Sequence, residues 1–155
     1  MKIEKAKNIY GKICEMLDSF NLKFDRNDEK FMINCAMQGA DLPITINMQV
    51  NAEKELIHVL SYIPVEVPED KRIDMAIAVS VTNSKLVDGN FDFNVKEGSL
   101  FFKMSNCYID STVGIETLKY LFICSIQTIE DFNDKFQMLA EGKLKIDYFI
   151  ENGNN

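Results

Sequence analysis

The sequence predicts a single α+β domain in which antiparallel strands are grouped between helices. Some segments repeat apolar residues every three or four positions, other runs alternate apolar and polar residues, and the links between consecutive runs are turn-length. Short links favour an antiparallel meander, because parallel strands need long crossovers. The expected order is α-β-β-β(-β)-α-β-β-α in one domain over residues 1–150, followed by a disordered polar tail at 151–155.

The first part of the chain predicts one amphipathic helix and then three or four strands. Residues 2–19 place an apolar stripe along one face of a helix, and residues 22–25 then alternate briefly. Three longer strand-like runs follow at 31–37, 44–50 and 55–63, with polar turns between them. The third run is apolar on both faces. We therefore expect it in the middle of the sheet, covered on both sides or covered on its second face by a partner chain.

A second helix is predicted at residues 69–85. Pro68 suits the start of a helix, and the acidic residues after it favour the positive end of the helix dipole. A strand is the alternative, because the run is rich in β-branched residues. As a helix, the segment is apolar around more than half of its circumference, which is more than one sheet face can cover. The candidate dimer or partner interface consists of Ile73, Met75, Ile77, Val79 and Val81.

The last part of the chain predicts a hairpin and a long helix. Residues 91–95 alternate as a strand, and Glu97–Gly98 turns the chain into a second strand at 100–109. The final helix carries an apolar stripe as far as Leu139. Residues 144–150 form either one more helical turn or an extended tail. The cap of the long helix is expected from Asp110, Ser111 or Thr112.

Charge and cysteine content narrow the classes of function. The net charge is −7, which repels phosphate backbones, so we expect no nucleic-acid partner. No apolar run is long enough to span a membrane, and the first residues lead into an amphipathic helix rather than a signal peptide. Free cysteines without an export signal indicate the cytoplasm.

No motif predicts a catalytic, cofactor or metal site, so we expect a protein that is not an enzyme. The four cysteines lack CxxC or CxxH spacing, the glycines form no phosphate-binding loop, and Asp88–Asp92 lacks a calcium loop with its closing Glu. A thiol enzyme would pair His58 with Cys35 or Cys107. We favour the interpretation that His58 is an ordinary strand residue.

Four short motifs follow one another in the second half of the chain. They are V-P-E-D-K-R at 67–72, Asn83, G-N-F-D-F at 89–93 and G-S-L-F-F at 98–102. This series resembles the YbjN-like bacterial domain over roughly residues 30–139, although the chain lacks the Trp that many relatives carry. Turns and caps explain the same residues without a ligand, because Pro starts a helix, Gly permits positive φ and Asn can end a helix.

The resemblance implies a fold similar to that of class I type III secretion chaperones, which are small, acidic, often dimeric proteins that bind extended protein segments. It also implies that the second helix contributes to a dimer interface. The leading hypothesis is a non-enzymatic, chaperone-like or adaptor module, a homodimer, that binds another protein segment. The alternative is a small-molecule or regulatory sensor with a pocket between the sheet and the C-terminal helix. Its polar groups would come from Asn47, Gln49 or Tyr62.

Overall fold

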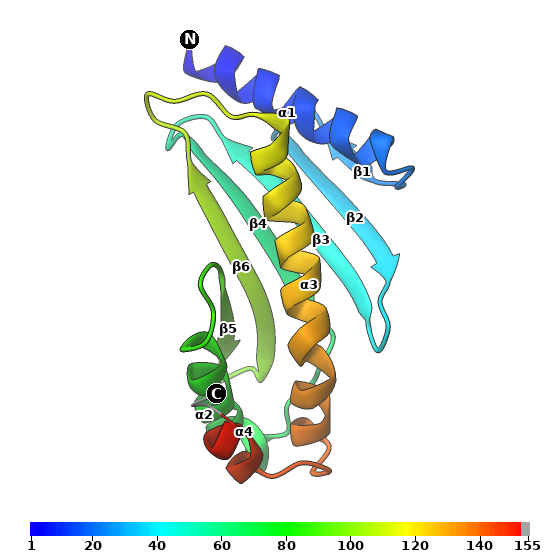
Figure 1. Ribbon diagram of the computed structural model, residues 1–155, viewed down its shortest axis with the longest axis vertical. Helices are drawn as coiled ribbons and strands as arrows, with labels where there is room; N and C mark the ends of the chain where they lie inside the picture. The colour runs from blue at the N-terminus through cyan, green and yellow to red at the C-terminus, as the bar shows by residue number, and fades with distance from the viewer. Residues whose placement is uncertain (153–155) are drawn as a thin grey trace.

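One six-stranded antiparallel sheet forms the centre of the molecule (Figure 1). The computed structural model describes residues 1–152. The strand order is β1-β2-β3-β4-β6-β5, so the first four strands form a meander and β6 inserts beside β4. This confirms the predicted α+β class. The strands are β1 (Asp25–Asn27), β2 (Met32–Gln38), β3 (Pro43–Asn51), β4 (Leu56–Ile63), β5 (Asn90–Asn94) and β6 (Ser99–Cys107).

The helices lie over one face of this sheet and at one end of it (Figure 1). Helices α1 and α3 pack against the sheet and against each other, whereas α2 packs against β5, α3 and α4. A short 3-10 turn and α2 together replace the single helix predicted at 69–85. No helix among residues 1–152 is long and apolar enough to cross a membrane. The helical segments are α1 (Lys2–Ser19), η1 (Glu69–Lys71), α2 (Arg72–Asn83), α3 (Ile115–Ala140) and α4 (Ile146–Asn152).

Strand β4 shows that only one face of the sheet is covered by the chain itself. Ile57, Val59 and Ile63 point to the helices and are at most 1% exposed. The alternate residues Leu60 and Tyr62 point to the other face and are 38% and 45% exposed. The expected position of this strand in mid-sheet is confirmed. Cover on both sides by the chain itself is wrong, because the helices lie on one face alone. We call the uncovered side the open face.

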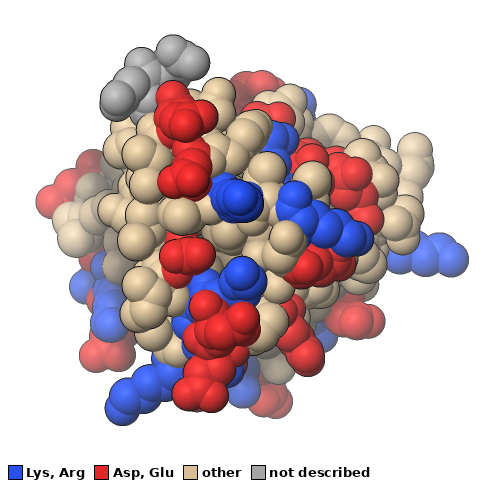
Figure 2. Space-filling view, turned by 90° about the horizontal axis from the view of Figure 1, so that it is seen from below, with Lys and Arg blue, Asp and Glu red and all other residues tan. Residues whose placement is uncertain are grey.

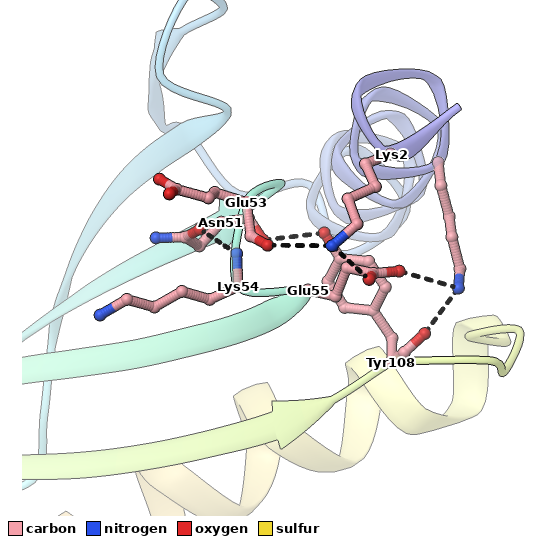
Figure 3. Close-up of polar contacts among 7 residues, drawn as sticks. Lys2, Asn51, Glu53, Lys54, Glu55 and Tyr108 are labelled. Carbon is pink, nitrogen blue, oxygen red and sulfur yellow. Dashed lines mark hydrogen bonds and ion pairs between the residues drawn. The ribbon is translucent and has the colours of Figure 1, made fainter.

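An ion-pair cluster fixes the start of α1 to the sheet (Figure 3). Glu55, in the turn between β3 and β4, lies 2.9 Å from the Lys2 ammonium and 3.5 Å from that of Lys5. Lys5 also donates to the backbone oxygen of Tyr108 at 2.6 Å, just after β6. The hydrogen bond from Lys2 and the two positive charges hold the pKa of Glu55 below its usual value. Three segments far apart in the sequence are thereby joined.

The start of α3 and the C-terminal segment differ from the sequence-based expectations. Helix α3 begins after Gly114, which makes no side-chain cap, so none of the three residues at 110–112 caps it. Residues 146–152 form helix α4, whose Phe149 stacks on Phe136 of α3 with ring centroids 5.8 Å apart. Of the tail predicted to be disordered at 151–155, Glu151 and Asn152 are helical instead, and 153–155 lie outside the described residues.

Candidate functional site

Arg72 joins the start of α2 to the β5–β6 hairpin. Its guanidinium donates to the backbone oxygens of Val67, Lys96 and Glu97 at 3.2, 2.5 and 3.4 Å. Gly98 lies beneath this group with a φ of +76°, and a Cβ there would come within 2.5 Å of the Val67 oxygen. The close approach and the positive φ both require glycine. These motif residues therefore hold the hairpin in place.

Asn83 performs a similar task at the other end of α2. Its side-chain amide donates to the Phe91 oxygen at 2.9 Å and accepts from the Phe91 N–H at 2.8 Å. The sequence-based expectation of a helix cap or a left-handed residue is wrong, because Asn83 is the last α2 residue and does not have a positive φ. The motifs that carried the family resemblance are thus explained by contacts of α2 with β5 and with the turn of the β5–β6 hairpin.

The candidate interface on α2 divides into a buried part and an exposed part. Met75 is fully buried and Val79 is 6% exposed, so neither can contact a second chain without unfolding α2. Ile73 and Ile77 are 65% and 41% exposed, and Val81 is half-buried. Helix α4 covers part of the apolar circumference that the sequence analysis assigned to a partner. Ile73 and Ile77 form what we call the α2 outer face.

An apolar cluster lies in the middle of the open face. Tyr62 of β4 is opposite Phe101 of β6, with ring centroids 5.5 Å apart in an edge-to-face arrangement. Leu60 precedes Tyr62 on the same face and is opposite Lys103, whose ammonium is paired with the carboxylate of Asp92. Tyr62, Leu60 and Phe101, which we call the open-face cluster, are solvent-exposed or half-buried on central strands.

A shallow hollow of about 580 Å³ adjoins this cluster on the open face. A second hollow, of about 430 Å³, shares the lining residues Leu60 and Lys103 with the first, so the two adjoin each other. Asn47 and Gln49 therefore line a surface on the side of the sheet away from α3. The sequence analysis placed these two residues in a pocket between the sheet and the C-terminal helix. That placement is wrong, because the residues that alternate with them along β3 point toward the helices, and Asn47 and Gln49 point to the opposite face. The polar side chains that line the first hollow are Asn47, Gln49, His58, Asp88, Asn90, Lys103 and Ser105.

The thiol-enzyme alternative does not fit the positions of the cysteines. Cys35 is fully buried on the helix-covered face, whereas His58 lies on the open face. Burial raises the pKa of the Cys35 and Cys14 thiols, which disfavours the reactive thiolate. Cys107 is exposed at the end of β6. Among the described residues, no hydrogen bond joins His58 to any thiol, and no cluster of acidic, histidine or cysteine side chains could hold a metal ion.

These features define the class of fold. It is an α+β domain in which helices cover one face of an antiparallel sheet and the other face is open and partly apolar. No protein-family model and no curated protein matches the sequence. Solved structures do match its fold. One is YbjN from E. coli, described as a candidate transcription regulator, with a TM-score of 0.59 and 13% identity over 83% of this chain and 89% of that chain.

Two further matches come from complexes of secretion chaperones. A chain of the ExsC–ExsE complex matches with a TM-score of 0.57 and 15% identity, over 86% of this chain and 93% of that chain. A chain of the HopA1–SchA chaperone–effector complex matches with a TM-score of 0.50 and 11% identity, over 79% and 88%. At these identities the similarity concerns the fold. It confirms the YbjN-like fold and its likeness to type III secretion chaperones.

Proposed function

We propose that this chain is a non-enzymatic, chaperone-like or adaptor module that binds a segment of another protein on its open face. The observation that carries the proposal is the open-face cluster, where Tyr62 and Leu60 of a central strand are 45% and 38% exposed. A cluster of exposed apolar side chains is typical of a site that interacts with another molecule. The fold similarity to chains from chaperone complexes supports the same class of function.

Covering the open-face cluster with a partner should be favourable in free energy, because it removes apolar surface from water. Burying apolar surface stabilises a complex by about 25 cal/mol per Å², and aromatic residues are enriched where proteins bind each other. Tyr62 and Phe101 already hold each other in a fixed edge-to-face geometry. They would lose little side-chain entropy on binding, so most of the gain from burial would remain.

The experiment compares the wild-type protein with Tyr62→Ser. Each is used to capture partners from the native cytoplasm, and the captured protein is then purified and titrated by calorimetry. Tyr148→Ser is the matched control, because Tyr148 is a tyrosine of comparable exposure, 37%, on α4. We expect Tyr62→Ser to lose the partner and Tyr148→Ser to retain it. Equal binding by all three proteins would contradict the open face as the site.

The second part of the proposal is that the module is a cytoplasmic homodimer formed through the α2 outer face. The exposed stripe continues from Ile73 and Ile77 to Ser80 and, just after α2 ends, to Ser84, and none of these four side chains is charged. Two copies with a net charge of −7 each repel one another, so an uncharged contact is the least costly. Met75 and Val79 would support this surface from beneath.

Light scattering with size-exclusion chromatography tests the dimer at micromolar concentration. We expect a dimer mass for the wild type and a monomer mass for the double variant Ile73→Asp/Ile77→Asp. Val87→Asp serves as the control, because Val87 is fully exposed outside α2. A monomeric wild type would remove the dimer from the proposal and leave segment binding intact.

A sensor for a small molecule is the second candidate function. The hollow beside the cluster favours it, because its 580 Å³ could hold a small ligand and His58, Gln49 and Ser105 supply donors and acceptors. A thermal-shift screen of polar metabolites tests it. A ligand that stabilises the wild type and not Gln49→Ala would support the sensor, and no shift with any compound would count against it.

A further inference from the structure

The open face is nearly free of charge, although 26% of the residues in the chain are charged. At the α2 and α4 end of the molecule, acidic and basic side chains are interspersed over the surface (Figure 2). Across the six strands, the charged residues that share the open face are Asp25 at the β1 edge and the paired Asp92 and Lys103. The strands β2, β3 and β4 present no formal charge there.

The polar side chains on this face are mainly uncharged amides and hydroxyls. The Asn47 amide donates to Asn34 Oδ1 at 2.8 Å, from β3 to β2. In the next row, Gln49 is opposite His58, which in turn is opposite Ser105. Side chains of these types can donate and accept hydrogen bonds, as a peptide backbone does. A row of this kind can form hydrogen bonds with the polar groups of an uncharged polypeptide segment that lies over it.

The spacing of the open-face groups along β4 matches that of an extended chain. His58, Leu60 and Tyr62 follow each other at every second residue, which places them about 6.8 Å apart. Alternate side chains of another extended segment have the same spacing. A segment running along β4 can therefore place one apolar side chain on the open-face cluster and its next inward-facing side chain over the hollow.

We infer that the open face binds an extended polypeptide segment without charged side chains at the contact, rich in amide and hydroxyl residues and anchored by one aromatic or aliphatic residue. This inference rests on the proposed function and names the partner's chemistry. A charged residue placed over β3, β4 or β6 would lose water and meet no free charge on the strands, because Lys103 and Asp92 neutralise each other. The Asp88 carboxylate, in the loop before β5, also lines the first hollow and accepts from the Gly89 N–H at 2.9 Å. The acidity of the rest of the chain therefore does not select a basic partner at this site.

Synthetic peptides with both termini blocked test this chemistry by fluorescence anisotropy. The reference peptide alternates Thr, Ser, Asn and Gln around one central Phe. Its variants replace the Phe by Ser, or two inward-facing polar residues by Lys or by Glu. We expect the reference peptide to bind and each variant to bind weaker by about tenfold or more. We also expect Tyr62→Ser to lose the reference peptide and the Tyr148→Ser control to retain it.

The outcomes separate the inference from the proposed function. Tightest binding by the Lys peptide, with strong dependence on salt, overturns the uncharged segment and leaves protein binding in place. Binding unaffected by Tyr62→Ser places the segment elsewhere and also overturns the inference. A change of oligomeric state in Tyr62→Ser, with no peptide bound by the wild type, assigns the face to a second copy of the chain. No binding of any peptide together with no captured partner overturns both.

Discussion

The side-chain amide of Asn83 makes with Phe91 both hydrogen bonds that a neighbouring strand would make. Its nitrogen donates to the Phe91 oxygen at 2.9 Å, and its oxygen accepts from the Phe91 N–H at 2.8 Å. Strand β5 is the last strand of the sheet, so this backbone would otherwise be free at an edge. Free edges invite pairing with other chains. Helix α2 thus closes the edge at Phe91 with one residue.

Asn83→Ala should destabilise the fold by about 1–3 kcal/mol, because it leaves the Phe91 N–H without a partner and leaves the Phe91 oxygen with only the 3.2 Å contact from the Asn90 amide. Urea unfolding followed by circular dichroism measures the change. Asn90→Ala is the control, since the exposed Asn90 amide donates only to that same oxygen, at 3.2 Å, and its removal leaves both Asn83 hydrogen bonds in place. We expect the control to change stability by less than about 0.5 kcal/mol. Equal losses in the two variants would contradict a special role for Asn83.

Arg72→Lys should cost about 1–2 kcal/mol although it keeps the charge. A single ammonium cannot reproduce the planar donors that reach Val67, Lys96 and Glu97 together. Thermal and urea unfolding measure the loss. The reverse exchange at an exposed position, Lys85→Arg, is the control and should leave stability unchanged. If Arg72→Lys matches the wild type, the guanidinium does not hold the hairpin.

Glu55→Gln should reduce the melting temperature at neutral pH and lose this effect in acid. The pKa of Glu55 lies below its unfolded value of about 4.3, because Lys2 and Lys5 stabilise the carboxylate. Its contribution is therefore complete above about pH 5 and disappears as the pH falls through the native pKa. Melting curves of the two proteins should converge on acidification.

Glu53→Gln is the matched control for Glu55→Gln. Glu53 lies two residues away in the same turn, and its side chain is exposed. The melting temperature of Glu53→Gln should equal that of the wild type at every pH. A gap between wild type and Glu55→Gln that widens in acid would contradict the ion-pair cluster.

Tyr10→Phe tests the contact between α1 and the β1–β2 turn at alkaline pH. Burial and the 2.7 Å hydrogen bond to Asp28 raise the pKa of Tyr10 to about 12, against an unfolded value of about 10. The neutral form therefore stabilises the fold fully below pH 10, and this is lost as the pH rises through 12. We expect the stability difference between wild type and Tyr10→Phe to shrink over that interval in urea unfolding. The exposed Tyr148→Phe serves as control and should show no such change.

Regular alternation and turn chemistry predicted most of the fold. The residues of β2 and β3 alternate clearly and are linked by a polar turn, so both strands and their antiparallel pairing followed from period two and the short link. Helix α4 followed only as one of two alternatives for the C-terminal segment, beside an extended tail. Its few residues are too short to establish a helical period, and it is held by Phe149 stacking on Phe136, a contact across the chain that local patterns do not encode.

The candidate site was predicted only in part, for a physical reason. Periodicity correctly indicated that residues 55–63 are apolar on both faces, and this was the signal for the open face. The α2 interface was overestimated, because a helical period cannot tell which apolar residues another part of the same chain will cover. Met75 and Val79 are covered in this way. The amide of Asn83 was assigned to a cap because its partner Phe91 becomes a neighbour only after the hairpin folds.

Because helices cover only one face of the sheet, alternate residues of a single strand are subject to different constraints on substitution. In β4, Val59 and Ile63 are packed against the helices, and a change there alters the core. Leu60 and Tyr62 point away from the packed core and are 38% and 45% exposed, so they can be exchanged at little cost in folding. The open face can therefore diverge rapidly between relatives while the scaffold persists. A designer can likewise rewrite the alternate residues of β3, β4 and β6 to give the same scaffold a new binding specificity.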